Sequence, residues 1–147
     1  MDVEEAMGPR RTRPAGIPPT ASLREAARWM DETGASALPV VVEDEVVGVV
    51  TDRDLALHAV ARGLSADSPV ETVMAGESVT VGPDTDVPVA IRSMRSAGAR
   101  HLPVADGGGV VGMVSFDDLL WALTQELVDL TTPIDAARRR RDQPPAR

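Results

Sequence analysis

Two short segments of the sequence place a hydroxyl side chain three residues before a carboxylate. They are 48–54, Gly-Val-Val-Thr-Asp-Arg-Asp, and 112–118, Gly-Met-Val-Ser-Phe-Asp-Asp. The hydroxyl and carboxylate pairs are Thr51 with Asp54 and Ser115 with Asp118. An ionised carboxylate only accepts hydrogen bonds, so it can bind both hydroxyls of a diol. The same spacing is also the capping box that begins a helix, and a capping box needs no ligand.

The rest of the chain offers little catalytic chemistry. All 15 residues counted as lysine or arginine are arginine, so the chain has no lysine for a Schiff base or a phosphate-binding loop. It has no cysteine, which excludes zinc thiolates and a thiol nucleophile. The run 52–54 is similar to the Asp-x-Asp nucleophile of phosphatases, but that chemistry needs a supporting lysine. Phe116 also replaces Asp52 in the second segment. We therefore predict no catalytic residue, no metal site and no enzymatic activity.

An internal repeat positions both segments. Aligned at an offset of 64 residues, 34–55 and 98–119 are identical at 11 of 22 positions, where chance gives about two. In each copy a capped apolar stripe predicts a helix, and two apolar runs joined by a turn predict a hairpin. The predicted elements are strands at Ile17 and 79–81, helices at 22–33 and 86–97, hairpins at 38–50 and 102–114, and closing helices at 52–62 and 116–130.

The predicted fold class is therefore α+β, with two β-α-β-β-α units at residues 1–64 and 65–130. A sheet of about three strands is rarely stable alone, so the two units should pack as one pseudo-two-fold pair. Residues 131–147 contain Pro133 and four consecutive arginines, 138–141. This composition predicts a flexible arginine-rich tail, either simply solvated or in contact with an acidic partner.

Charge and hydropathy limit the possible partners. The formal net charge is −8 and the pI is about 4.7, so the body of the protein should repel nucleic acid. The N-terminus is acidic where a signal peptide would be basic, and no apolar run approaches the ~20 residues of a membrane span. We expect a cytoplasmic protein without membrane or nucleic-acid partners.

The sequence resembles the CBS-domain family, whose tandem pairs are called Bateman modules. The resemblance covers roughly residues 1–130, and it is carried by the two segments above, the Leu-Pro-Val runs at 38–40 and 102–104, and the dipeptides at 6–7 and 73–74. Pairs of this family generally bind AMP, ADP, ATP, NAD or S-adenosylmethionine in clefts between the repeats. The resemblance implies a non-catalytic sensor that binds such an adenosine-containing ligand and signals to a protein partner in trans.

The resemblance implies two ligand sites on this chain. One adenine would lie against Ile17, Leu38, Pro39 and Val40, and the other against Val81, Leu102, Pro103 and Val104. Asp54 and Asp118 would accept hydrogen bonds from the ribose diols, with Thr51 and Ser115 beside them.

Basic residues predict where phosphates would lie. Arg53 stands in the first segment, while Arg100 and His101 precede the second strand pair, where the first copy has neutral residues. Because a phosphate could reach both Arg100 and His101, we expect unequal sites, the second of which prefers the more phosphorylated ligand. An ordinary structural role for His101 stays open.

The resemblance also implies a homodimer, since the family stacks two pairs into a disc. In agreement, the last helix has an apolar stripe that a single small globule could not bury. The stripe consists of Leu119, Leu120, Leu123 and Leu127. The alternative to a ligand sensor is a ligand-free dimeric scaffold or stress-response adaptor.

Overall fold

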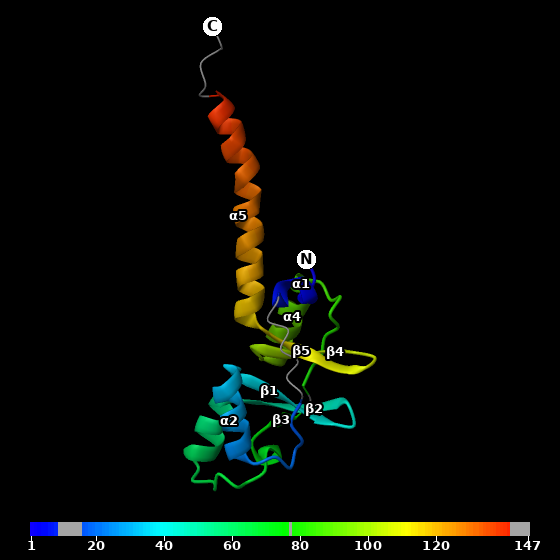
Figure 1. Cartoon of the computed structure of the whole chain (residues 1–147), viewed down its shortest axis with the longest axis vertical. Helices are drawn as coiled ribbons and strands as arrows, with labels where there is room; N and C mark the ends of the chain where they lie inside the picture. The colour runs from blue at the N-terminus through cyan, green and yellow to red at the C-terminus, as the bar shows by residue number, and fades with distance from the viewer. Residues whose placement is uncertain (9–15, 77, 142–147) are drawn as a thin grey trace.

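Two units of mixed helix and strand are stacked one above the other in the computed structural model, and a long helix projects from one end (Figure 1). The structure describes residues 1–8, 16–76 and 78–141. In chain order the elements are α1 (Val3–Met7), α2 (Leu23–Thr33), β1 (Ala37–Val42), β2 (Glu45–Thr51), α3 (Asp52–Asp54), the π-helix η1 (Leu55–Val60), the 3₁₀-helix η2 (Val70–Thr72), β3 (Ala75–Gly76), α4 (Val87–Ala97), β4 (His101–Asp106), β5 (Gly109–Ser115) and α5 (Phe116–Arg141).

Both predicted hairpins are confirmed. Strands β1, β2 and β3 form an antiparallel sheet in that order, and β4 and β5 form a second antiparallel pair. The strands expected before the first helix of each copy are reduced to single parallel bridges, Ile17 to Val40 and Val81 to Val104. The two sheets adjoin at the middle of the molecule, so the helices lie on its outer faces (Figure 1).

The first helix of each copy forms for the reasons that the sequence gives. Ser22 and Glu25 make the reciprocal hydrogen bonds of a capping box at the start of α2. Gly34 and Gly98 end α2 and α4 with φ of 71° and 62°, where a residue with a Cβ would be strained. The buried face of α2 is Leu23, Ala26 and Met30, and that of α4 is Val87, Ala90 and Met94. The stripe predicted for α2 also included Ala27, which is exposed instead.

The two spatial units do not coincide with two consecutive stretches of chain. Helix α1, which begins the chain, buries Val3 and Met7 in the core of the second unit, where the Val3 amide donates to the Thr85 carbonyl at 2.8 Å. Conversely, Val70 and Val73 lie in the core of the first unit, beside α2. Each unit is therefore completed by a segment that precedes the other copy in the sequence.

This exchange explains why glycine recurs in the middle of β2 and β5. A Cβ on Gly48 would lie 2.7 Å from the Ala75 carbonyl oxygen and 2.8 Å from the Met74 sulfur. A Cβ on Gly112 would collide with the terminal methyl of Met7. Each methionine thus packs on the glycine of the unit that it completes.

The closing helices differ from the sequence-based expectation. The helix expected at 52–62 continues as a π-helix after Asp54, with its hydrogen bonds one residue wider than those of an α-helix. Helix α5 does not end near residue 130. It continues past Pro133 to Arg141, so the prediction of a loose tail was wrong for 131–141, and 142–147 lie outside the described residues. The alanines and arginines at 136–141 favour a helix, and α5 continues through Pro133 although a proline there removes a hydrogen bond and crowds the preceding turn.

Within the described residues, no helix is both long and apolar enough to cross a membrane.

Candidate ligand-binding site

An open cavity of about 680 Å³ lies where the two units meet. The first unit contributes the end of β2 and the start of α3, including Thr51, Arg53 and Asp54. The second contributes Arg100 and His101 at the start of β4, together with the junction of β5 and α5. The cavity is the size of a small-molecule pocket and draws polar groups from both copies of the repeat.

Both hydroxyl and carboxylate pairs form capping boxes, as one of the two interpretations of the sequence predicted. The Asp54 carboxylate accepts from the Thr51 amide at 2.9 Å, and the Thr51 hydroxyl accepts from the Asp54 amide at 3.1 Å. Ser115 and Asp118 repeat this at 2.9 and 3.1 Å, and the Ser115 hydroxyl also donates to Asp118 at 2.7 Å. In both pairs Oδ2 is the only carboxylate oxygen that accepts these bonds, so Oδ1 is not used by the cap.

The two carboxylates face different cavities. Asp54 lines the cavity between the units, where the side chain is 19% exposed and its Oδ1 lies 3.8 Å from His58 Nε2. Asp118 instead lines a second, wider cavity between α1 and the base of α5. Sequence reasoning grouped Arg100 and His101 with Asp118. The structure places them in the same cavity as Asp54.

Most of the residues expected to wall the adenine are buried inside the sheets. Of the eight, only Leu102 lines the cavity between the units. The other seven are Ile17, Leu38, Pro39, Val40, Val81, Pro103 and Val104, all of which are buried. Apart from Leu102, the Leu-Pro-Val runs therefore belong to the hydrophobic cores and do not line the cavity. Val49 and Val79 supply apolar surface there that sequence reasoning missed.

His101 joins the two units directly. Its Nε2 lies 2.9 Å from the hydroxyl of Ser36, which occupies the position of Arg100 in the first copy. Burial lowers the pKa of the His101 imidazole below its usual range, and Arg100 acts in the same direction. The carboxylates of Asp52, Asp118 and Asp117 partly offset this effect.

Arg100 lies at the exposed rim of the cavity. Its guanidinium is 3.5 Å from the Asp117 carboxylate and 5.9 Å from the centre of the Phe116 ring. Because both charged groups are well exposed, the ion pair adds little stability and can be exchanged for a ligand phosphate. No ion pair of Arg53 occurs in the part of the chain that the structure describes.

Ser78 is a polar residue of the cavity that no motif in the sequence pointed to. Its hydroxyl oxygen is buried and has no hydrogen-bond partner among the described residues. A buried hydroxyl without a partner is costly, so this atom is a candidate contact for a polar ligand group. No group of three or more metal-binding side chains occurs in residues 1–8, 16–76 and 78–141.

Comparison with known proteins identifies the repeat. The family model of the CBS domain matches residues 3–60 and again 70–125. The chain belongs to the CBS-domain family. It is a tandem CBS pair, and such pairs are regulatory modules.

Individual relatives agree with this assignment. The CBS domain-containing protein YhcV of Bacillus subtilis is 35% identical over 108 residues, which cover 74% of this chain and 77% of YhcV. An inosine-5′-monophosphate dehydrogenase of Korarchaeum cryptofilum is 33% identical over 106 residues, which cover 71% of this chain and 21% of the enzyme. The chain spans 54% of an uncharacterized Methanopyrus kandleri protein, so some relatives are considerably longer.

Solved structures confirm the α+β fold of paired repeats. A putative signal-transduction protein with CBS domains from Burkholderia ambifaria has a TM-score of 0.74 and 30% identity, covering 84% of this chain and 93% of that one. The CBS domain pair of protein MJ0100, solved in complex with 5′-methylthioadenosine and S-adenosyl-L-methionine, has a TM-score of 0.74 and 24% identity. It covers 86% of this chain and 98% of that pair, and at this identity it supports the fold alone.

Proposed function

We propose that this CBS pair is a non-catalytic sensor that binds an adenosine-containing ligand in the cavity between its units. The candidates are AMP, ADP, ATP, NAD and S-adenosylmethionine, and the output goes to a protein partner in trans. The observation that carries the proposal is the convergence of Asp54 with Arg100 and His101 in one cavity. That cavity thus holds an acceptor for a ribose diol together with donors for a phosphate.

Three further features support this placement. The Oδ1 oxygen of Asp54 is left unused by the cap, the Ser78 hydroxyl lacks a partner among the described residues, and Val49 and Val79 give apolar surface for a purine. The adenosine moiety shared by the two ligands of protein MJ0100 is consistent with this class of ligand. Phosphates would lie toward Arg53, Arg100 and His101.

The alternative function is a ligand-free dimeric scaffold or stress-response adaptor. It is favoured by the capping boxes, because both carboxylates already have a structural role without any ligand. In this case Asp54 and Asp118 would contribute stability only.

Replacing Asp54 with asparagine separates the two functions. The remaining amide oxygen can still accept from the Thr51 amide, so the free energy of unfolding should change by less than the ~1 kcal/mol that a lost cap costs. The charge and the second acceptor are lost, so ligand affinity should fall about 10-fold or more. Calorimetry with the five candidate ligands measures the affinity, and thermal unfolding measures the stability.

Asp31→Asn is the matched control, because it removes the same charge from an exposed position on α2. It should bind the ligand as the parent does. Absence of binding by the parent with all five ligands at millimolar concentration would instead favour the scaffold.

A further inference from the structure

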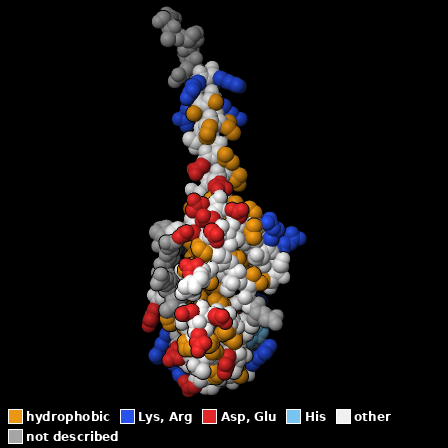
Figure 2. All heavy atoms as spheres, turned by 90° about the vertical axis from the view of Figure 1, so that its right-hand side faces the viewer, with side chains coloured by type: hydrophobic (Ala, Val, Ile, Leu, Met, Phe, Trp, Pro, Cys, Tyr) orange, Lys and Arg blue, Asp and Glu red, His pale blue; other side chains and the backbone are white. Residues whose placement is uncertain are grey.

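Helix α5 leaves the body of the protein after its first two turns. Leu119 and Ala122 are buried against the second unit, whereas every residue from Thr124 to the described end at Arg141 is exposed. Figure 1 shows this part of α5 standing alone, and Figure 2 shows hydrophobic side chains along its length. Most of the stability of a helix in a protein comes from the packing of its apolar face, so the projecting part lacks its main source of stability unless something covers it.

The apolar residues of α5 follow a seven-residue repeat. They alternate at spacings of four and three residues, namely Phe116, Leu120, Leu123, Leu127, Leu130, Ile134 and Ala137. This spacing forms the seam of a two-stranded coiled coil. Exposure along the seam is 52% at Leu120, 65% at Leu127, 66% at Leu130 and 54% at Ile134. Leu123 also packs against the core of the second unit, whereas the seam from Leu127 onward is exposed, and Pro133 lies outside the seam.

We propose that this seam packs against the same seam of a second copy of the chain, as an antiparallel two-helix coiled coil. The inference deepens the homodimer expected from the sequence, because it assigns the contact to the projecting part of α5. It does not depend on which ligand the cavity binds, or on whether it binds one.

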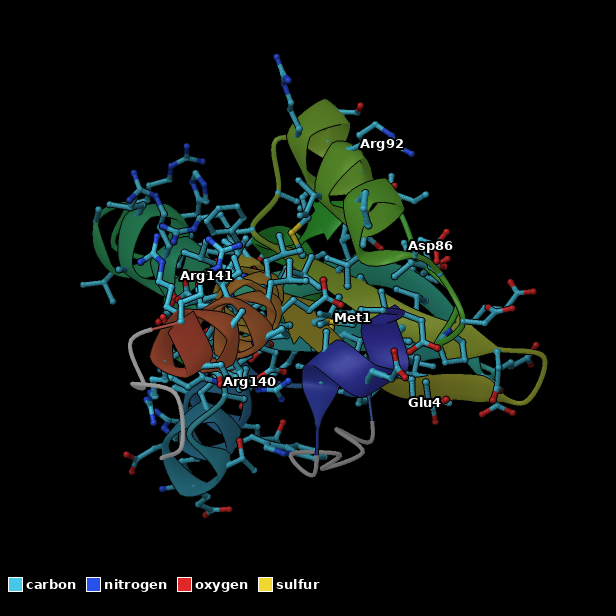
Figure 3. All side chains as sticks on the ribbon, turned by 90° about the horizontal axis from the view of Figure 1, so that it is seen from above. Met1, Glu4, Asp86, Arg92, Arg140 and Arg141 are labelled. Carbon is cyan, nitrogen blue, oxygen red and sulfur yellow. The ribbon has the colours of Figure 1, made fainter. Side chains whose placement is uncertain are left out.

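Charge selects the antiparallel orientation. In a parallel pair the arginines 138–141 of the two copies would lie side by side, and eight like charges would meet at one end. In an antiparallel pair each arginine run lies beside the base of the other α5, where Phe116 and Asp117 are exposed. Figure 2 shows the basic side chains at the far end of the helix and acidic ones near its base, and Figure 3 shows Arg140 and Arg141 at that end.

The arginine run cannot reach this base within its own chain. Asp117 and Arg138 are 21 residues apart on one helix, a distance of about 32 Å at 1.5 Å per residue. In an antiparallel pair, Arg138 of one copy lies close to Asp117 of the other. The seam layers are then Leu120 with Ala137, Leu123 with Ile134, and Leu127 with Leu130, while Asp117 flanks Arg138 of the other copy.

Sedimentation of Leu130→Glu tests the seam. In the antiparallel register the Leu130 side chain of each copy packs against Leu127 of the other, which gives two equivalent central layers. The substitution therefore places a carboxylate in both of them. We expect the parent to be a dimer at micromolar concentration and the variant to dissociate at least about 100-fold more readily. Val128→Glu is the matched control, because Val128 is 53% exposed on the same turn but lies outside the seam. It should remain dimeric.

Engineered cysteines test the orientation independently of any folding defect. The chain has no cysteine, so Leu120→Cys and Ala137→Cys can be introduced alone and together. On one helix these positions are about 26 Å apart, so a disulfide between them joins two chains. We expect covalent dimers from the double variant, or from a mixture of the two single variants, and none from either variant alone.

A monomeric parent would overturn the inference, as would a dimer that Leu130→Glu leaves intact. Cross-linking of Leu120→Cys with itself would show a parallel pair. None of these outcomes depends on ligand binding, so the inference and the proposed function can fail separately.

Discussion

At the residue scale, His101 both connects the two units and has a lowered pKa. The imidazole is half-buried and contacts Ser36 of the first copy. Because burial lowers its pKa, His101 is mainly neutral near pH 7 in the absence of ligand. Protonation of the imidazole should therefore destabilise the folded state. A phosphate bound in the cavity should instead favour the protonated imidazole.

Replacing His101 with glutamine should reduce the pH dependence of stability. As pH falls, the unfolded chain takes up the His101 proton near pH 6.5, before the folded chain does. The parent therefore loses stability from about pH 6.5 downward, until the lowered pKa of the folded state is passed. Glutamine can keep a hydrogen bond to Ser36 without titrating, so this contribution should vanish. Denaturant unfolding at several pH values measures it, with His58→Gln as the control for the other histidine. Parallel stability curves for His101→Gln and the parent would contradict the prediction.

A phosphorylated ligand should bind more tightly at pH 6 than at pH 8. Phosphate raises the pKa of His101, so binding takes up a proton and is favoured where protons are available. This dependence should be steeper for ATP than for AMP if the additional phosphates approach Arg100 and His101. Calorimetry at the two pH values tests it, with Arg100→Ala as the variant. An Arg100→Ala protein that binds ATP as tightly as the parent would show that the phosphates lie elsewhere.

At the element scale, the paired glycines of β2 and β5 have different tolerance for a side chain. The obstacle at Gly48 includes the backbone carbonyl of Ala75, which belongs to the neighbouring strand β3. The obstacle at Gly112 is the flexible end of Met7.

We therefore expect Gly48→Ala to destabilise the protein more than Gly112→Ala. The added methyl at 48 must push two strands apart, at a cost of about 1–3 kcal/mol. The methyl at 112 requires only a new rotamer of Met7, so it should cost less. Denaturant midpoints of the two variants provide the comparison, and equal losses would mean that Met7 cannot move. Gly112→Ala with Met7→Ala is the control, because truncation of Met7 removes the clash.

The same elements show how far the sequence could predict the structure. Helix caps at Ser22 and Thr51 and the two hairpins depend on residues close in sequence, and local patterns identified them. The exchange of α1 with η2 depends on contacts between residues far apart in the sequence, 82 positions for Val3 with Thr85 and 49 for Val70 with Ala21. A five-residue helix carries no local signal for such contacts. For the site, the repeat selected Thr51 and Asp54, and the basic residues without a counterpart in the first copy selected Arg100 and His101. It did not reveal that Arg100 and His101 share a cavity with Asp54, because that depends on how the two units dock.

At the scale of the whole molecule, ligand binding should be visible as stability. A ligand that binds only the folded protein adds about 2.7 kcal/mol at 100 times its Kd. For a chain of this size the midpoint of thermal unfolding should rise by roughly 5–10 °C. Melting curves with each of the five candidate ligands test this, and Asp54→Asn should show a smaller shift. No shift with any of them would favour the scaffold function.

Removing the projecting part of α5 should affect association and leave the fold intact. A chain that ends at Gln125 keeps Leu119, Ala122 and Leu123, the residues of α5 that contact the core. We expect a native circular dichroism spectrum and a melting midpoint that no longer depends on protein concentration, whereas that of a dimeric parent rises with concentration. A shortened chain that fails to fold would show that α5 stabilises the body as well.

The exchange of terminal segments also affects the order in which a growing chain can fold. Val3 and Met7 are made well before the strands and helices that bury them. The first repeat cannot complete its own core until Val70 and Val73 have left the ribosome. During synthesis Val3 and Met7 therefore stay uncovered until the second repeat has been made, and neither repeat alone contains all the apolar residues of one core.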